Sequence, residues 1–361
     1  MAGFGGCWAT SMVLLLLVYS SYLGVGGGVV AGGVVSTQQC HSEDEAALLA
    51  VSAGLGRPYR LSSWSPDTWC CDWSDVDCDN STGRVVGLSV SQDGNLTGVG
   101  IPGDALAGLA HLRSLVLHHL PGLSGPIPES LAQLGNLSRL TISHTGVSGP
   151  VPSFLGQMTQ LAQLDLSCNS LSGAIPASLA DLPKLFAVNL SRNHLDGPIP
   201  AMLFSQLINQ QEQEAYLWVS HNNLSGGVPA EFAAVRFAHV DLSRNALTGD
   251  PSPALLSNSK QRVTTILEHL DLSRNGFRFS LTGLADLPEK LNFLDLSHNA
   301  IRGRIPAALP NLTDLTFLDL SYNKLCGQVP SGGVMTRFDA SSFQHNKCLC
   351  GAPLPACPKM S

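Results

Sequence analysis

The sequence predicts a repeat solenoid of the α/β class, and three observations support this prediction. A 24-residue motif recurs along the chain, with its clearest copies beginning at Leu161, Leu185, Leu291 and Leu315. The 361 residues include 36 Gly and 22 Pro but only 13% charged residues, which favours short elements joined by tight turns. Eight of the ten cysteines gather in two clusters, one at each end of the repeated region, as expected for stapled caps on a stack.

Each clear copy contains the pattern L-x-x-L-x-L-x-x-N, followed by G-x-I-P or G-x-V-P. The alternation of apolar and polar residues predicts a short strand whose leucines point into the stack and whose x residues point outward. One repeat cannot bury its apolar face alone, so its neighbours must cover it. Degenerate copies begin at Leu112, Leu137, Glu214, Phe237 and Leu267, and a weak one runs through Val85, Leu88 and Val90. We therefore expect about ten repeats over residues 84–325, forming a right-handed leucine-rich-repeat superhelix with a concave parallel β-sheet.

Two kinds of residue mark the turns of the repeat. A glycine follows each clear strand, and Gly173, Gly197, Gly226 and Gly303 are expected to adopt backbone conformations that other residues disfavour. The asparagines that end the strand pattern should satisfy backbone groups of their own turn and of the next repeat, since an orphaned buried amide would cost about 1–3 kcal/mol. These asparagines are Asn169, Asn193, Asn222, Asn245, Asn275, Asn299 and Asn323.

The N-terminal segment has the features of a secretory signal. Residues 1–39 contain no Asp, Glu, Lys or Arg, and the apolar run Met12–Tyr19 is too short to span a bilayer. We expect a signal peptide at 1–36, an N-terminal cysteine cap at 37–83 and a C-terminal cysteine cap at 326–361. An uncleaved membrane anchor is the alternative, although no later stretch is long and apolar enough to span. The N-terminal cap should contain an amphipathic helix over Glu43–Gly54.

The cysteines and sequons agree with secretion. The two clusters are expected to form disulfides, and adjacent Cys70 and Cys71 should take different partners because neighbours pair poorly with each other. Zinc is the competing interpretation, but no histidine spacing supports it, so we expect no metal and no cofactor. Cys168 stands alone and is expected to remain a free thiol. The clusters are Cys40, Cys70, Cys71, Cys78 and Cys326, Cys348, Cys350, Cys357. The expected N-glycosylation sites are Asn80, Asn95, Asn136, Asn189, Asn223 and Asn311.

No pattern in the chain predicts catalysis. The G-x-S-x-G, H-E-x-x-H and P-loop motifs are absent from the sequence, and Ser, His and Asp recur in each strand as repeat consensus rather than as a triad. The net charge of -7 and the lack of a basic run argue against a nucleic-acid partner. We therefore expect a binding protein and not an enzyme.

The outward strand positions are the candidate partner-binding residues. Large apolar groups on an exposed face usually mark a contact surface, and a ladder of acids beside them would complement a basic cleft. The alternative is that the Asp column is only repeat consensus, neutralised by neighbouring Arg244 and Arg274. The outward histidines should become protonated in an acidic compartment. The candidate residues are Glu268, Asp271, Asp295, Asp319, Asp241, His269, Trp218, Phe293 and Phe317.

Several segments resemble a known family. CCDWSDVDC at Cys70–Cys78 resembles the N-terminal cap of plant receptor-like proteins. The C-terminal run Asn323–Cys357 resembles the polygalacturonase-inhibiting proteins of plant cell walls, as do TGVSGPVPSFL at Thr145–Leu155 and the paired VDLSRN and LDLSRN within Val240–Asn275. The resemblance covers nearly the whole mature chain. Departures are Asp75, where the cap pattern has Gly, and insertions around Gln206–Glu214 and Pro251–Thr265.

The resemblance implies a secreted protein of the plant cell wall, or apoplast, that binds and inhibits fungal or insect polygalacturonases through its concave face. It also implies the disulfides Cys40–Cys70, Cys71–Cys78, Cys326–Cys348 and Cys350–Cys357. Cell-wall pectin and a receptor kinase are further candidate partners. The alternative function is a soluble apoplastic protein that binds a peptide or receptor in developmental or defence signalling. A third hypothesis, binding of a polysaccharide or ice, lacks the flat Thr or Ser array that ice would favour.

Overall fold

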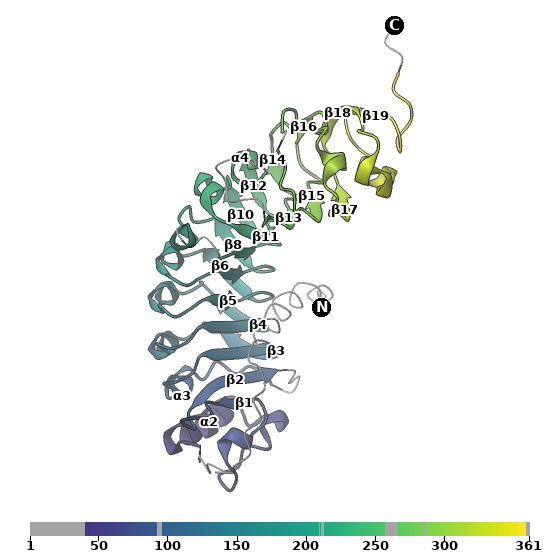
Figure 1. Cartoon of the computed structure of the whole chain (residues 1–361). Coiled ribbons are helices and arrows are strands. Elements are labelled where there is room, and N and C mark those ends of the chain that lie inside the picture. Colours follow the sequence, from purple (N-terminus) through teal and green to yellow (C-terminus); the bar gives the residue numbers. More distant parts are fainter. Residues whose placement is uncertain are drawn as a thin grey trace, which may run out of the picture.

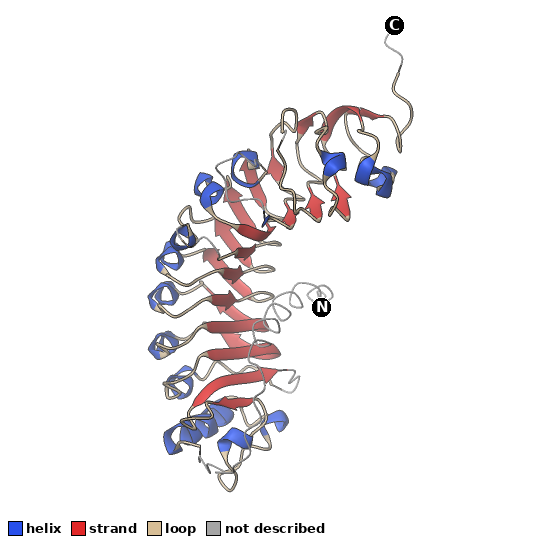
Figure 2. Ribbon diagram, viewed as in Figure 1, coloured by secondary structure: helices blue, strands red, loops and turns tan. Residues whose placement is uncertain are grey.

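The computed structural model describes residues 40–91, 96–208, 210, 213–256, 266–284 and 286–358. The chain forms a curved stack of repeats, with short helices along the convex side and strands along the concave side (Figures 1 and 2). The expected signal peptide at 1–36 lies outside the described residues. No helix within the described ranges is long and apolar enough to cross a membrane.

The concave sheet contains ten parallel strands among the described residues, one for each repeat, which confirms the expected repeat number. At its N-terminal edge β1 (Val76–Cys78) pairs antiparallel with β2 and covers an otherwise open edge. The strands are β2 (Val85–Ser91), β3 (Ser114–Gly125), β4 (Arg139–Gly149), β5 (Gln163–Asp165), β7 (Ala187–Asn189), β9 (Ala215–Trp218), β11 (Phe237–Asp241), β13 (His269–Asp271), β15 (Phe293–Asp295) and β17 (Phe317–Asp319).

A second set of short parallel strands follows the turn of each repeat, and β3 and β4 are long enough to run into it. These strands are β6 (Ser170–Ala174), β8 (His194–Gly197), β10 (Asn223–Gly226), β12 (Ala246–Gly249), β14 (Gly276–Phe277), β16 (Arg302–Gly303), β18 (Lys324–Gln328) and β19 (Cys348–Cys350). The glycines that end them have φ between 72° and 91° at Gly173, Gly197, Gly226 and Gly303, as the sequence predicted. A residue with a Cβ is strained in that left-handed region.

The convex side is built from single helical turns, because each repeat has only about ten residues to return to the next strand. The α-helices are α2 (Ser42–Gly54), α3 (Gly103–Ala107) and α4 (Ser252–Leu255). The 3₁₀ helices are η1 (Tyr59–Leu61), η2 (Cys70–Asp72), η3 (Glu129–Gln133), η4 (Ser153–Gln157), η5 (Ala177–Asp181), η6 (Ser205–Leu207), η7 (Ala230–Ala234), η9 (Leu309–Asn311), η10 (Gly333–Arg337) and η11 (Ala340–Ser342).

The inward leucines form one apolar core that runs the length of the stack. Leu164, Leu190 and Leu270, for example, are fully buried, and each such side chain contributes roughly 1.5–3 kcal/mol. Each repeat therefore depends on both neighbours to cover its core, which is the reason for the two caps.

The asparagine ladder ties adjacent repeats together. In Asn193, Nδ2 donates to the Leu190 carbonyl of its own turn at 3.1 Å and to the Leu166 carbonyl of the preceding repeat at 2.9 Å. Its Oδ1 accepts from the Leu171 amide, also in the preceding repeat. The predicted role is thus confirmed, except that the bonded neighbour is the preceding repeat. Asn346 makes the same bonds, so the C-terminal cap continues the ladder, a feature the sequence analysis missed.

The N-terminal cap is fixed to the first strand by a buried ion pair. Helix α2 confirms the predicted amphipathic helix, and its Asp44 has no exposed surface. Arg84 donates to both Asp44 carboxylate oxygens at 2.7 and 2.9 Å, and the Val85 amide donates to one of them at 2.8 Å. Because both charges are satisfied, the pair is tolerated; removal of one partner would leave a buried charge uncompensated.

Asp75 has φ 67°, which explains why the related cap pattern has glycine there. The aspartate compensates for this strained conformation with its side chain, because Arg60 donates to both carboxylate oxygens at 2.8 and 3.0 Å.

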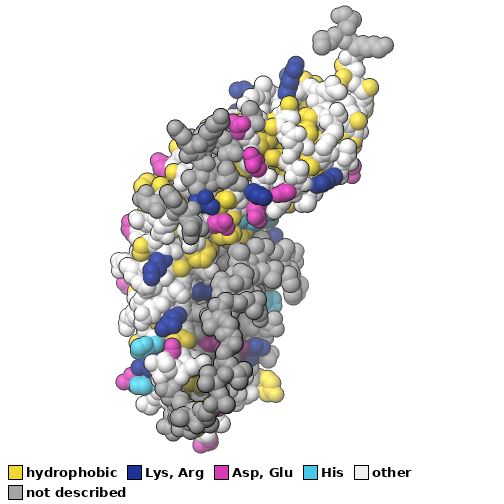
Figure 3. All heavy atoms as spheres, in the orientation of Figure 1, with side chains coloured by type: hydrophobic (Ala, Val, Ile, Leu, Met, Phe, Trp, Pro, Cys, Tyr) yellow, Lys and Arg dark blue, Asp and Glu magenta, His cyan; other side chains and the backbone are white. Residues whose placement is uncertain are grey.

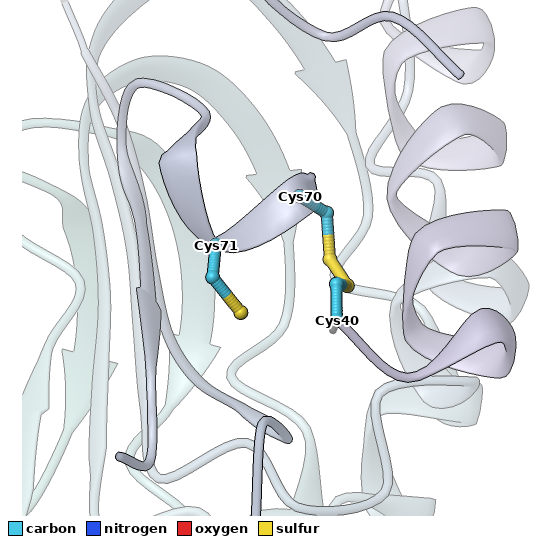
Figure 4. A group of neighbouring side chains, drawn as sticks. All are labelled: Cys40, Cys70 and Cys71. Atoms are coloured by element: carbon cyan, nitrogen blue, oxygen red, sulfur yellow. A yellow bond between two sulfur atoms is a disulfide. The ribbon is translucent and has the colours of Figure 1, made fainter. Parts of the chain in front are cut away.

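All four cap disulfides implied by the resemblance are present. The sulfurs of Cys40, Cys70 and Cys71 lie within 4.8 Å of one another, a spacing at which three residues could hold a metal ion. Figure 4 shows the Cys40–Cys70 bond with the Cys71 sulfur directed elsewhere, toward its own disulfide with Cys78. These sulfurs are oxidised and are not available as zinc-binding thiolates.

The prediction that Cys168 is a free thiol is wrong. It is disulfide-bonded, and no described cysteine is free. The prediction considered only partners within the repeats, whereas the Cys168 side chain is partly exposed at the turn after β5 and can be reached from outside the stack.

Candidate functional site

The concave face is organised in columns, because the parallel strands pair in register. One column, which we call the outer column, begins with Ser114, Arg139, Gln163 and Ala187 and continues with Tyr216, His239, His269, Phe293 and Phe317. Two residues further along each strand lies the carboxyl column, which contains Asp165, Asn189, Trp218, Asp241, Asp271, Asp295 and Asp319. A third column, the turn column, holds the residue just before each ladder asparagine.

Aromatic and imidazole rings form a continuous ladder over five strands, β9 to β17. The ring centroids of His239 and His269 are 3.9 Å apart, those of His269 and Phe293 4.0 Å, and those of Phe293 and Phe317 4.3 Å, all stacked within 12°. Trp218 joins the ladder from the carboxyl column, with its centroid 4.6 Å from that of His239. We call Trp218, His239, His269, Phe293 and Phe317 the aromatic ladder.

The two ends of the aromatic ladder differ in their exposure to solvent. Trp218 is only 2% exposed, whereas Phe317 is 40% exposed and the intermediate rings are partly buried. The prediction that Trp218 projects as a contact residue is therefore wrong, since neighbouring side chains cover it. Phe317 presents an open ring face, while His269 and Phe293 are stacked on both faces and expose only part of their surface; together the three can form an apolar contact patch.

The aspartates of the carboxyl column have a structural role. The carboxylates of Asp271, Asp295 and Asp319 each accept a hydrogen bond from the backbone amide two residues later, at 2.8–2.9 Å. Asp241 does the same and is itself buried. These acids lie on the concave side as expected, but each uses a carboxylate oxygen to hold its own strand end, which limits its availability to a partner.

Burial also changes the charge of this column. It raises the pKa of Asp271 to about 6, and the nearby Asp241 carboxylate adds to the increase. It likewise raises the pKa of Asp295 to about 6, assisted by Asp271. These carboxyls are therefore largely protonated in an acidic compartment, and they supply little of the negative field that the sequence analysis assigned to them. Glu268, by contrast, is exposed next to the ladder.

The turn column has a backbone conformation that the sequence analysis did not anticipate. In nine successive repeats and in the C-terminal cap, its residue has φ between 53° and 57°, although none is glycine or asparagine. The amide of this residue donates to the next repeat, as Arg192 does to the Ser220 carbonyl at 2.8 Å. This bond offsets the cost of the left-handed conformation. The ten are His119, His144, Cys168, Arg192, His221, Arg244, Arg274, His298, Tyr322 and His345.

The arginines of the turn column do not neutralise the aspartates by direct pairing. Neither Arg244 nor Arg274 forms an ion pair with a carboxylate in the described part of the chain. Figure 3 shows acidic and basic side chains intermixed near the bend of the stack, with hydrophobic groups among them. The part of the surface visible there therefore carries no extended field of one sign.

Several outward histidines have lowered pKa values, contrary to the expectation that they become protonated in an acidic compartment. Burial lowers the pKa of His118, His221 and His269 to about 4, and it lowers the pKa of His239 well below the usual value. Burial also lowers the pKa of His298. The prediction that an acidic compartment would protonate the outward histidines is wrong for His118, His221, His239 and His269, because desolvation favours the neutral ring.

The predicted glycosylation sites differ in access. Asn80, Asn136, Asn223 and Asn311 are exposed, and Asn95 lies outside the described residues. The site at Asn189 is contradicted, since this side chain has 0% exposure within β7 and the folded sheet leaves no room for a glycan. The insertion around Gln206–Glu214 begins within η6 (Ser205–Leu207). In the insertion around Pro251–Thr265, residues 257–265 lie outside the described residues.

Comparison with known families identifies the repeats and the N-terminal cap. A leucine rich repeat N-terminal domain matches residues 41–79. Leucine rich repeat models match residues 135–195, 290–312 and 314–333.

Several curated relatives match over most of the chain. A polygalacturonase inhibitor of Pyrus communis is 47% identical over 319 residues, covering 88% of this chain and 92% of the relative. Polygalacturonase inhibitor 2 of Arabidopsis thaliana is 44% identical over 334 residues, with the same coverage of both chains. Leucine-rich repeat protein FLOR 1 of Arabidopsis thaliana is 46% identical over 323 residues, covering 89% of this chain and 94% of the relative.

Among solved structures, a plant ice-binding protein superposes with a TM-score of 0.83 at 40% identity, covering 90% of this chain and 100% of that one. The ectodomain of the Arabidopsis thaliana receptor kinase HAESA, in complex with an IDA peptide hormone, superposes with a TM-score of 0.61 at 30% identity. That match covers 86% of this chain and 53% of the ectodomain.

Proposed function

The chain belongs to the polygalacturonase-inhibitor family of leucine-rich-repeat proteins, and on this premise we propose that it binds a fungal or insect polygalacturonase through its concave face and inhibits that enzyme. It would act as a binding protein without catalysis of its own, secreted to the plant cell wall. The observation that carries the proposal is the accessible end of the aromatic ladder, where exposed Phe317 and partly exposed Phe293 give this face apolar contact surface.

The position of the patch favours a large partner over a small ligand. His269, Phe293 and Phe317 lie on three adjacent strands of an open, curved sheet. Aromatic groups of this kind carry much of the binding energy of protein interfaces when a partner excludes water from them. Exposed Glu268 at the edge of the patch can orient a partner whose substrate cleft is basic, as expected for an enzyme that binds a polyanion.

A direct inhibition assay tests the proposal. The secreted, untagged protein would be titrated into a panel of fungal and insect polygalacturonases, and release of reducing ends from polygalacturonic acid would be measured. We expect saturable inhibition of at least one enzyme, together with a stoichiometric complex by size-exclusion chromatography. Absence of both inhibition and complex formation across the panel would contradict the proposal.

Peptide or receptor binding is the second candidate function. It is favoured by the similarity to a receptor ectodomain in complex with a peptide hormone at 30% identity. A pull-down of receptor-kinase ectodomains with the same protein separates the two candidates, because an inhibitor would capture the polygalacturonase and leave these ectodomains unbound.

Ice binding has less support from this surface. The residue before the glycine of these repeats is Ser124, Ser148, Ser172, Asp196, Ser225 and Thr248 in turn. The charged Asp196 interrupts this row of hydroxyl groups, so the row matches a lattice less well than an unbroken array would.

A further inference from the structure

Three histidines gather on the N-terminal half of the concave face, away from the aromatic ladder. His118 and His119 lie in β3, and His144 lies in the adjacent β4. The ring centroids of His118 and His144 are 4.8 Å apart, and each lies 6.1 Å from the centroid of His119. The proposed inhibition does not use these three rings.

This cluster departs from the repeat pattern. The position of His118 is occupied by serine in the clear repeats, including Ser143, its register partner in the next strand. His119 and His144 are in the turn column with φ 55° and 56°, so their side chains leave equivalent points of two neighbouring repeats in the same direction. A histidine in place of the consensus serine thus adds a third ring where two already lie side by side.

The spacing of one pair of these rings fits ligation of one metal ion, and the third ring lies next to that pair. A tetrahedral zinc ion bound to three imidazole nitrogens at about 2.0–2.1 Å holds the ring centroids about 5 Å apart. The His118–His144 pair is at that spacing, whereas the His119 ring, 6.1 Å from both, would have to move about 1 Å closer on metal binding. The structure presents the rings as neighbours and not yet converged on one point.

A buried hydroxyl orients one of the rings. Nδ1 of His118 lies 2.9 Å from Oγ of Ser143, and Ser143 is fully buried. With Nδ1 held in this bond, Nε2 is the nitrogen left to act as a ligand. Metal-binding histidines commonly have the other ring nitrogen fixed by such a partner.

We propose that His118, His119 and His144 bind a divalent transition metal ion of the zinc or copper type, for which neutral imidazole is a suitable ligand. Three protein ligands leave a coordination position for water or for a carboxylate of a bound molecule. The ion would place positive charge on the N-terminal half of the face.

Isothermal titration with Zn²⁺ tests the site in the secreted, untagged protein after removal of metal. We expect one ion per chain, a rise in melting temperature with added Zn²⁺, and loss of both effects in H118A/H119A/H144A. Single H118A and H144A variants should weaken Zn²⁺ binding about tenfold or more, and Ser143→Ala should weaken it about tenfold while all three rings remain. In the protein loaded with Cu²⁺, nitrogen hyperfine structure in the electron paramagnetic resonance spectrum should disappear in the triple variant.

His298→Ala is the matched control, because His298 occupies the same turn column but stacks on Tyr322 at 4.1 Å, away from the cluster. Its Zn²⁺ binding should equal that of the wild type. If the triple variant fails to fold, His119→Ala alone decides the question, since that side chain is exposed and its removal leaves the core intact. The proposal is overturned if the wild type binds no Zn²⁺, or if the variants at His118, His119 and His144 bind it as the wild type does.

Discussion

The two halves of the concave face share a scaffold but differ in what they present. In the N-terminal half, the outer column consists of Ser114, Arg139, Gln163 and Ala187, whereas in the C-terminal half it becomes His239, His269, Phe293 and Phe317. The ladder asparagines make the same bonds in both halves, as Asn193 and Asn299 show. The fold therefore does not demand the aromatic rings.

This difference shows which columns carry information about a partner. The carboxyl column and the ladder asparagines repeat because they satisfy the backbone at each strand end. The outer column faces the concave space and is not constrained by the turn. Its change from Ser, Arg, Gln and Ala to rings is the feature on which the proposed partner contact rests.

The largest expected effect is a loss of inhibition that only substitutions in the C-terminal half of the concave face should cause. In F293A/F317A we expect the inhibition constant to rise roughly a thousandfold, because two interface anchors of about 2 kcal/mol each are lost. The matched control R139A/Q163A removes outer-column side chains from the adjacent strands β4 and β5, together with the hydrogen bond between them, and should inhibit like the wild type. Equal losses of inhibition in both variants would erase the functional distinction between the halves.

The next largest effect is a loss of folding stability, and it should be the same in both halves of the stack. Asn193→Ala and Asn299→Ala each orphan two carbonyl groups and one amide, and we expect each to lower the free energy of unfolding by about 2–4 kcal/mol. Urea denaturation followed by circular dichroism measures it. A much smaller loss at one of the two positions would mean that the scaffold is not uniform.

A pH effect of about 2 kcal/mol or less should be found in the C-terminal half. The folded-state pKa of Asp295 is raised to about 6 from 3.8, so the folded protein holds this proton more tightly than the unfolded chain. The wild type should therefore lose stability relative to Asp295→Asn as pH rises from about 4 to 6. Asparagine preserves the local bond, because Asn189 in the same column accepts from the Ser191 amide.

For His269→Gln, the pH dependence of the difference in stability from the wild type should have the opposite sign to that for Asp295→Asn. The folded-state pKa of His269 is lowered to about 4 from 6.5, so the wild type should lose stability relative to this variant as pH falls from about 6.5 to 4. Chemical denaturation at several pH values compares the two variants. Slopes of the same sign would show that burial does not govern both groups.

The smallest expected effect concerns charge at the edge of the patch. Glu268 is exposed, so Glu268→Gln should weaken inhibition only about threefold, mainly through slower association, with the loss reduced at high salt. Stopped-flow or surface plasmon resonance measures the association rate. A loss comparable to that of F293A/F317A would assign the main role to charge instead of apolar contact.

The sequence predicted the scaffold well because the scaffold is periodic. The repeat number, the glycine turns and helix α2 all follow from local patterns, and the cap disulfides follow from the resemblance of the cap sequences. The predicted binding surface was less accurate, since a period-two pattern tells which side a residue faces but not how far its neighbours cover it. Trp218, Asp241 and Asn189 all face the concave side and are nevertheless buried.

Other features depend on contacts between repeats that no single repeat displays. The left-handed backbone conformation of the turn column could not be predicted, because no glycine or asparagine marks these positions. The conformation is stabilised instead by amide hydrogen bonds to the following repeat. The lowered pKa of His269 and the raised pKa of Asp295 likewise arise from stacking against adjacent strands. A search for histidines in neighbouring repeats could have found the His118, His119 and His144 cluster.

Hydroxyl-radical footprinting of the complex with an inhibited polygalacturonase tests the central claim most directly. Phe317 and Tyr322 are 40% and 46% exposed on the C-terminal half, whereas Tyr59 and Trp69, at 85% and 47%, lie on the N-terminal cap as internal references. We predict that complex formation strongly lowers the oxidation rates of Phe317 and Tyr322 and leaves those of Tyr59 and Trp69 unchanged. Unchanged oxidation of Phe317 and Tyr322 in a saturated complex would contradict the assignment of the partner surface to this half of the face.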